Sequence, residues 1–171
     1  MQKNKYINYS VFLNTIATLV VLYASYLALR FAAQPLLDEH SFRQTQTALT
    51  SYWFIQEGFK LAYQTPVAGY PWSIPFEFPI YQIIVSYLTK VFNLSLDLTG
   101  RLTSYAFLLL SLFPVKSITK KLNLPSSVFK FFVAIVFSMP IYMYWGRNFM
   151  IETAALFFSI VSIKYFLDFF C

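Results

Sequence analysis

The sequence predicts an all-α integral membrane protein, and three observations support this fold class. Hydrophobic residues make up 58% of the 171 residues and charged residues only 12%. The mean hydropathy is +0.56, and polar surface this scarce does not coat a water-soluble domain. Apolar runs of spanning length recur along the chain, so we expect about four transmembrane helices, with interfacial helices in the first outer loop.

The first expected span covers residues 11–33. A mostly apolar run of about 20 residues, at about 1.5 Å per residue, matches a hydrocarbon core of about 30 Å. Lys3 and Lys5 precede it, and no small-x-small site closes it as in a cleaved signal peptide. We interpret this run as an uncleaved anchor whose amino terminus lies inside.

Three further spans are expected at residues 101–117, 129–146 and 153–171. Pro114 and Pro140 fall inside two of them, where proline is tolerated because neighbouring groups satisfy the freed carbonyl. The connection from the second span into the third is lysine-rich and contains no acid, with Lys116, Lys120, Lys121 and Lys130. The positive-inside rule therefore places this connection in the cytoplasm, together with the amino terminus.

The expected outer loop covers residues 34–100, with surface helices at about 41–59 and 76–92. Segment 41–59 is moderately amphipathic, whereas segment 76–92 has two interpretations. If it spans, the lysine-rich connection faces outward, and Asp38 and Glu152 lie on opposite sides of the bilayer. If it lies in the outer interface, both lysine clusters are inside and the two acids share one side. The lysine placement favours the interfacial interpretation.

Charged residues gather at the outer ends of these elements. The candidate site residues are Asp38, Glu39, His40, Arg43, Arg101, Arg147 and Glu152. A carboxylate at the interface can accept a proton from an attacking hydroxyl, and arginine can hold a phosphate with paired donors and stabilise its departure. These residue types therefore favour a reaction on an anionic lipid-linked substrate.

Plain structural roles stay open for most of these residues. Asp38 precedes a predicted helix and could cap it, with Glu39 as a first-turn acid. Arg101 and Arg147 could be interfacial anchors. Glu152 lies in an apolar stretch, where a carboxylate is a functional hypothesis by default.

Metal binding has weak support in the sequence. His40 could bind a metal together with Asp38, but no further ligand is evident near them. We assign no metal ligand, and a divalent cation stays open as a cofactor. Nucleic acid is not expected, because most lysines lie in short clusters beside apolar runs rather than on a polar stripe.

Four segments carry a resemblance to a known superfamily. LLDEHSFRQTQTA follows the first span, SIPFEFPIYQ lies in the outer loop, TGRLTSYAF opens the second span, and YWGRNFMIETAALFF follows later. In this order they resemble the amino-terminal part of the GT-C superfamily of polyprenyl-phosphate-sugar-dependent glycosyltransferases. The resemblance is greatest to the branch that contains the protein O-mannosyltransferases, the lipid A aminoarabinose transferase and related bacterial membrane sugar transferases. Each motif is degenerate, so their order carries more weight than any one of them.

The resemblance implies a role for several residues. Asp38 stands where the family has its catalytic base or acceptor-orienting acid, and Glu39 resembles the second member of the Asp-Glu pair. Arg101 matches the arginine expected to meet the lipid phosphate. Glu152 stands where the family usually has aspartate, which leaves its metal or acceptor role open.

The predicted function is inverting transfer of a sugar from a polyprenyl-phosphate donor to an acceptor hydroxyl. The acceptor is a lipid, a glycan or a protein, and the reaction lies on the outer face of a bacterial inner (plasma) membrane. Family members are much longer, so we expect an incomplete copy that is inactive alone. The alternative is a small non-enzymatic membrane protein that binds or flips lipid-linked sugars. A transporter fragment would place charges deep within the spans, where only Lys164 is found.

Overall fold

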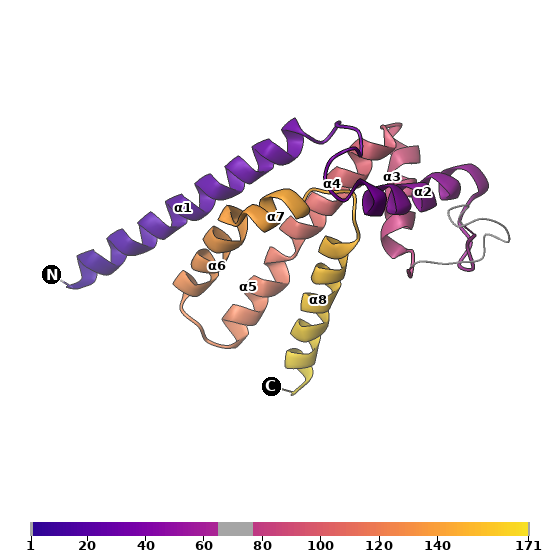
Figure 1. The fold of residues 1–171 in the computed structure, drawn as a ribbon. Helices are drawn as coiled ribbons and strands as arrows, with labels where there is room; N and C mark the ends of the chain where they lie inside the picture. Colours follow the sequence, from indigo (N-terminus) through magenta and orange to yellow (C-terminus); the bar gives the residue numbers. More distant parts are fainter. Residues whose placement is uncertain (1, 65–76, 171) are drawn as a thin grey trace.

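The computed structural model describes residues 2–64 and 77–170, with side chains from residue 10 onward, and within these ranges every regular element is a helix. In chain order the helices are α1 (Gln2–Arg30), α2 (Ser41–Glu57), α3 (Ile80–Phe92), α4 (Leu96–Leu110), α5 (Leu112–Lys121), α6 (Ser126–Ser138), α7 (Pro140–Trp145) and α8 (Glu152–Phe170), as Figure 1 shows. The all-helical part of the predicted fold class is confirmed for these residues.

Three helical stretches of the described chain are long and apolar enough to cross a membrane: Ser10–Arg30, Leu96–Lys121 and Glu152–Phe170. The second stretch is formed by α4 and α5, which only Ser111 separates. The Ser111 hydroxyl donates to the Leu108 carbonyl oxygen at 2.6 Å within this junction. At 26 residues the stretch is longer than the expected span of 101–117.

The expected third span, residues 129–146, is not a single helix. It is divided into α6 and α7 at Met139, whose φ of −70° and ψ of 125° are extended. Pro140 is the reason, because proline disfavours the helical conformation in the residue before it. Helix α6 has 13 residues, or about 20 Å, which is less than a hydrocarbon core of about 30 Å. Among the described residues, three single helical stretches rather than four are therefore long and apolar enough to cross a membrane, and α6 and α7 together return the chain to the end where α8 begins.

Helix α3 is also short. Its 13 residues measure about 20 Å, so it cannot cross a core of about 30 Å by itself. This length agrees with the interpretation of segment 76–92 as a helix that does not span, although residue 76 lies outside the described residues.

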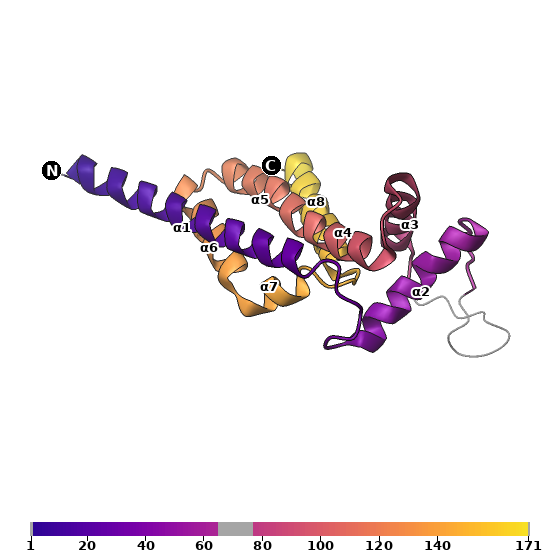
Figure 2. The ribbon, with the colours of Figure 1, turned by 90° about the horizontal axis from the view of Figure 1, so that it is seen from above.

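The helices alternate in direction, and the two ends of the bundle differ in composition. Helices α1 and α6–α7 run one way, and α4–α5 and α8 run the other way (Figure 1). We call the end where α1 finishes and α4 and α8 begin the polar end, and α2 and α3 gather there (Figures 1 and 2). We call the opposite end, with the turn between α5 and α6, the lysine end. There Lys121 pairs with Asp168 at 3.0 Å, which ties α5 to α8.

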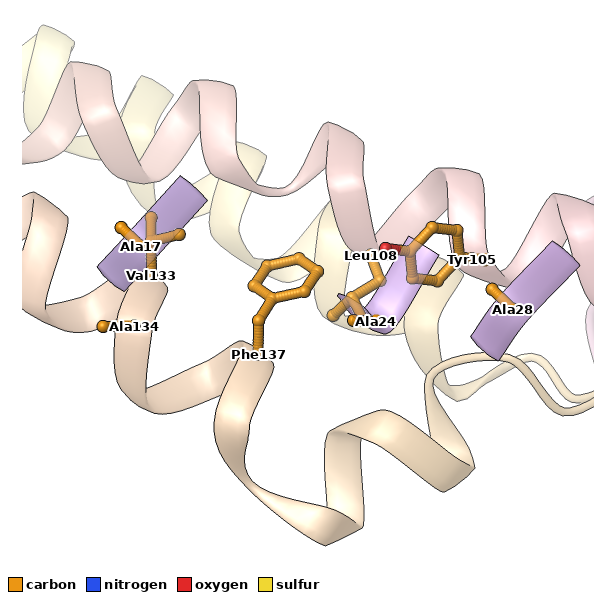
Figure 3. Close-up of a cluster of buried hydrophobic side chains, with 8 residues drawn as sticks. All are labelled: Ala17, Ala24, Ala28, Tyr105, Leu108, Val133, Ala134 and Phe137. Carbon is orange, nitrogen blue, oxygen red and sulfur yellow. The ribbon is translucent and has the colours of Figure 1, made fainter. Parts of the chain in front are cut away.

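The first hydrophobic cluster depends on small residues in α1. Ala17, Ala24 and Ala28 lie on one face of that helix and are buried against α4 and α6 (Figure 3). Their partners Leu108 and Phe137 are each 1% exposed. Small residues let helices approach closely where lipid offers no hydrophobic driving force between them. This cluster fixes α1, and hence the segment that follows it, against α4.

A second cluster lies at the polar end and joins α2, α3, α4 and α8. It consists of Leu36, Ala48, Tyr81, Val85, Phe107, Phe149 and Ala154. Gly100 of α4 faces the ring of Phe149 so closely that a Cβ atom at Gly100 would collide with it. A larger residue at Gly100 would therefore separate the 146–151 segment from α4.

Helix α2 turns polar residues inward. Gln44 and Thr47 are 0% and 1% exposed, whereas Phe42 is 72% exposed. This orientation is the opposite of a helix on a water-soluble core. Such an orientation would suit a helix at a membrane, where apolar side chains can face lipid without cost while polar groups find partners inside. The inward polar face of α2 supplies part of the candidate site.

Candidate functional site

Asp38 and Arg101 form a bidentate ion pair at the polar end. Arg101 comes from the second turn of α4, and Nη1 and Nη2 donate to the two carboxylate oxygens of Asp38, each at 3.1 Å. Nη2 also donates to the carbonyl oxygen of Pro35 at 3.3 Å. The Arg101 side chain is 1% exposed and that of Asp38 is 25% exposed. The pair therefore has a buried arginine and a carboxylate whose edge reaches the surface.

The charge state of Asp38 follows from this geometry. Burial acts to raise the pKa of the carboxyl group, but the hydrogen bonds and charge of Arg101, with a hydrogen bond from Gln44, outweigh it and lower the pKa below its ordinary value. Asp38 is thus ionised at neutral pH and accepts hydrogen bonds.

Gln44 connects three parts of the site. Its Nε2 donates to Oδ1 of Asp38 at 2.8 Å and to the carbonyl oxygen of Glu39 at 3.2 Å. Its Oε1 accepts from the backbone N–H of Phe149 at 3.1 Å. A fully buried glutamine with both ends satisfied fixes the loop after α1 against the segment before α8. Nothing in the sequence distinguished Gln44 from an ordinary surface glutamine.

The expected cap of α2 is not formed by Asp38. The N-cap position is held by His40, in the left-handed conformation with φ of 57°, and its side chain makes no capping hydrogen bond. The His40 ring instead packs edge-on against Trp145, with centroids 4.5 Å apart. Since helix capping does not occupy Asp38, that plain interpretation of the residue is wrong.

Glu39 presents its side chain to the surface. The residue is exposed, and its carbonyl oxygen accepts from Gln44 and, at 3.4 Å, from the Tyr144 hydroxyl. No group of three or more His, Cys, Asp or Glu side chains that could hold a metal is found in the part of the chain that the structure describes.

Arg43 joins two acids from distant segments. Its Nη2 lies 2.9 Å from Oε2 of Glu77, and its Nε lies 3.9 Å from Oε1 of Glu152. Glu77 also accepts from Nε2 of Gln82 at 2.6 Å. Glu152 is the first residue of α8, and its side chain is 52% exposed. At this position its negative charge interacts favourably with the helix dipole. Glu77 also belongs to this cluster, although it is not among the candidate site residues named from the sequence.

The two predicted site acids, Asp38 and Glu152, therefore lie at the same end of the bundle. Adjacent residues of α2 contact them, since Gln44 bonds to Asp38 and Arg43 approaches Glu152. The structure thus brings these residues together at one end of the bundle.

Arg147 lies near the Asp38–Arg101 ion pair, and one of its N–H donors has no partner among the described residues. Its Nε donates to the Met143 carbonyl oxygen at 3.2 Å, and its guanidinium lies over the ring of Phe31 at 4.9 Å. Nη1 is buried and has no hydrogen-bond partner within the described residues. Burial lowers the pKa of Arg147, and the charge of Arg101 lowers it further. A buried N–H without an acceptor is costly, so an anion placed there would be stabilised.

Tyr81 forms a buried hydrogen-bond network next to the site. Its hydroxyl donates to the Gly100 carbonyl oxygen at 2.7 Å and lies 2.7 Å from Oγ of Ser104, which in turn donates to the Met150 carbonyl oxygen at 3.1 Å. Tyr81 is 2% exposed, and this burial raises the pKa of its hydroxyl. The network ties α3, α4 and the segment before α8 together beneath the charged residues.

Comparison with protein-family models, with curated proteins and with solved structures found no match for this chain. The resemblance to the GT-C superfamily thus stays a prediction from the four sequence segments. The structure defines the class at a coarser level, as an all-helical protein in which three of the described helical stretches could cross a membrane.

Proposed function

We propose that this chain is the amino-terminal module of an inverting glycosyltransferase. It would take a sugar from a polyprenyl-phosphate donor on the outer face of a bacterial inner membrane. The observation that carries the proposal is the placement of an ionised carboxylate, held on both oxygens by Arg101, beside the unpaired N–H of Arg147. A base and an anion-binding group at one membrane-proximal end are what this transfer needs.

In the proposed reaction the acceptor hydroxyl oxygen attacks the anomeric carbon of the sugar. The hydroxyl proton passes to Asp38, and the bond from the anomeric carbon to the phosphate oxygen breaks. The polyprenyl phosphate leaves with that electron pair. The lowered pKa makes Asp38 a weak base in the resting state, so its main contribution is to orient the hydroxyl and receive the proton late.

The role that we assign to Arg101 differs from the one that the resemblance implies, whereas Arg147 keeps the phosphate contact considered for both arginines. The terminal nitrogens of Arg101 are already bonded to Asp38 and Pro35, which makes Arg101 a positioning residue for the carboxylate. Arg147 is the better ligand for the departing phosphate, since one of its terminal nitrogens is without an acceptor. Glu152, held near Arg43 and exposed, is placed to contact the acceptor, and Glu39 and His40 border the same region. No step of the proposal uses a metal.

The experiment uses the protein expressed from its complete reading frame and reconstituted in liposomes with a radiolabelled polyprenyl-phosphate sugar. Asp38→Asn should lower the rate of transfer by about 100-fold or more, since general-base contributions are of this order. Asp97→Asn is the matched control, because Asp97 lies in the first turn of α4 outside the ion pair. Melting curves of both variants separate lost chemistry from lost folding. Normal transfer by a folded Asp38→Asn variant would refute the proposal.

The alternative is a protein that binds or flips lipid-linked sugars without transferring them. The observation that favours it is the closed Asp38–Arg101 pair, which resembles an ion pair that fixes structure. In the same liposomes this alternative predicts donor binding with no transfer, and a loss of binding in Arg147→Gln but not in Asp38→Asn.

A further inference from the structure

The lysine end contains a basic groove between α1, α5 and α6. The groove has a volume of about 550 Å³, and its lining includes Asn14, Lys116, Lys120, Leu124, Phe129 and Lys130. This volume is within the range of about 300–1,000 Å³ that small-molecule sites occupy. The lining combines cationic, hydroxyl and apolar groups, and it contains no acid.

The positive charge of this groove is not neutralised by the acidic side chains of the described residues. The chain has seven acidic residues, all of them in the described part, and only Asp168 lies at the lysine end. Asp168 is already shared between Lys121 at 3.0 Å and Lys164 at 2.7 Å. None of the described ion pairs includes Lys116, Lys120 or Lys130.

The three groove lysines are arranged to converge. Lys116 and Lys120 are four residues apart on α5 and are both exposed, so they project from the same helix face. Lys130 comes from α6 across the turn, and its Nζ donates to Oγ of Ser10 in α1 at 3.0 Å. This bond fixes one ammonium group at the wall of the groove, while the two lysines of α5 stay free to close on a ligand.

The groove lies at the end of two stretches long enough to cross a membrane, Ser10–Arg30 and Leu96–Lys121. Its wall therefore meets the level of the lipid headgroups when these helices span. Leu124 and Phe129 add apolar surface that could contact the upper part of an acyl chain. Basic pockets between helices at this level are typical binding sites for acidic phospholipids.

We propose that this groove binds the headgroup of an anionic phospholipid through Lys116, Lys120 and Lys130. The occupant is a membrane lipid rather than a soluble phosphate compound, because the groove joins a charged mouth to apolar side chains at the membrane surface. The proposal depends on the spanning helices and does not depend on the proposed sugar transfer.

The test uses the full chain carrying Leu124→Trp, since Leu124 lines the groove and is exposed. The chain is reconstituted in vesicles that contain phosphatidylglycerol and phosphatidylcholine in the same ratio. In one sample only the phosphatidylglycerol is brominated, in the other only the phosphatidylcholine, and the brominated lipid quenches this tryptophan. The signal of the native tryptophans is subtracted with the chain that lacks the substitution. We expect preferential quenching by phosphatidylglycerol, and a fall of that preference by about five-fold or more in Lys116→Gln/Lys120→Gln, since each lysine near an anionic surface contributes about five-fold.

The control is Lys60→Gln/Lys90→Gln, which removes the same charge away from the groove and should keep the preference. Three results would overturn the proposal. They are equal quenching by the two lipids, an unchanged preference in the groove variant, and an equal loss in both double variants. Loss of the preference on addition of inorganic phosphate would also overturn it, since the occupant would then be a soluble phosphate.

Discussion

Arg101 holds the carboxylate of Asp38 with both of its terminal nitrogens, at 3.1 Å each, although the two residues are 63 positions apart. The arginine side chain is 1% exposed, and Asp38 is its ion-pair partner among the described residues. The pair joins the loop after α1 to the beginning of α4. It holds the carboxylate of Asp38 in one orientation.

The ion pair should be visible in a double-mutant cycle. Asp38→Asn should destabilise the protein by about 3 kcal/mol, because it leaves a buried guanidinium without a counter-charge. Arg101→Gln should cost less, since Asp38 is 25% exposed and water can reach it. The double variant should cost less than the two together. Thermal unfolding in detergent measures all four proteins, and strictly additive effects would show that the residues are not coupled.

Acid should weaken the protein through the same group. The pKa of Asp38 is lowered in the folded state, so its contribution to stability is complete above the ordinary aspartate pKa of about 4 and is lost as the pH falls through the folded value. We expect the melting temperature to be insensitive to Asp38 between about pH 5 and 7 and to fall below about pH 4. The difference between wild type and Asp38→Asn should shrink over that acid range. A constant difference would contradict the assignment.

Tyr81 should matter for its hydroxyl alone. Tyr81→Phe removes the bonds to Gly100 and Ser104 and should cost about 1–3 kcal/mol, the penalty for leaving buried polar groups unpaired. Tyr87→Phe is the matched control on the same helix, because Tyr87 is 66% exposed. The control should change stability by less than about 0.5 kcal/mol. Equal effects in the two variants would rule out the buried network.

Any side chain at position 100 should destabilise the protein as long as residue 149 is phenylalanine. Gly100→Ala should destabilise by about 1–3 kcal/mol through overpacking, because the new methyl group would collide with that ring. Adding Phe149→Leu should recover part of the loss, and this rescue is the control for a simple helix effect. Chemical denaturation of the single and double variants checks it, and a harmless Gly100→Ala would disprove the close approach.

The two ends of the bundle should face opposite sides of the membrane. In a Cys171→Ser background, Leu37→Cys is at the polar end and 83% exposed, and Ser117→Cys is exposed near the lysine end. A membrane-impermeant maleimide applied to intact spheroplasts should label Leu37→Cys and should label Ser117→Cys only after lysis. Labelling of Ser117→Cys in intact spheroplasts would contradict the predicted orientation, because it would place the lysine end outside.

Local sequence pattern was sufficient for the three long apolar helices, but not for every position where a helix begins or breaks. The apolar runs predicted spanning stretches near residues 11–33, 101–117 and 153–171, and helices long and apolar enough to span are found at each. Pro140 is visible in the sequence, but its effect on the conformation of Met139 outweighs the tolerance that proline has within membrane spans. The α4–α5 stretch also extends beyond the predicted span of 101–117 at both ends.

The sequence by itself determined that the chain is helical, that it is too apolar for a water-soluble domain, and which charged residues lie near helix ends, because these are properties of neighbouring residues. Only the tertiary structure decided that Arg101 is committed to Asp38, that Arg147 keeps a donor unused, and that Gln44 and Glu77 belong to the site. These relationships join segments far apart along the chain. They arise from how the helices pack, which the alanines of α1 and the inward polar face of α2 set together.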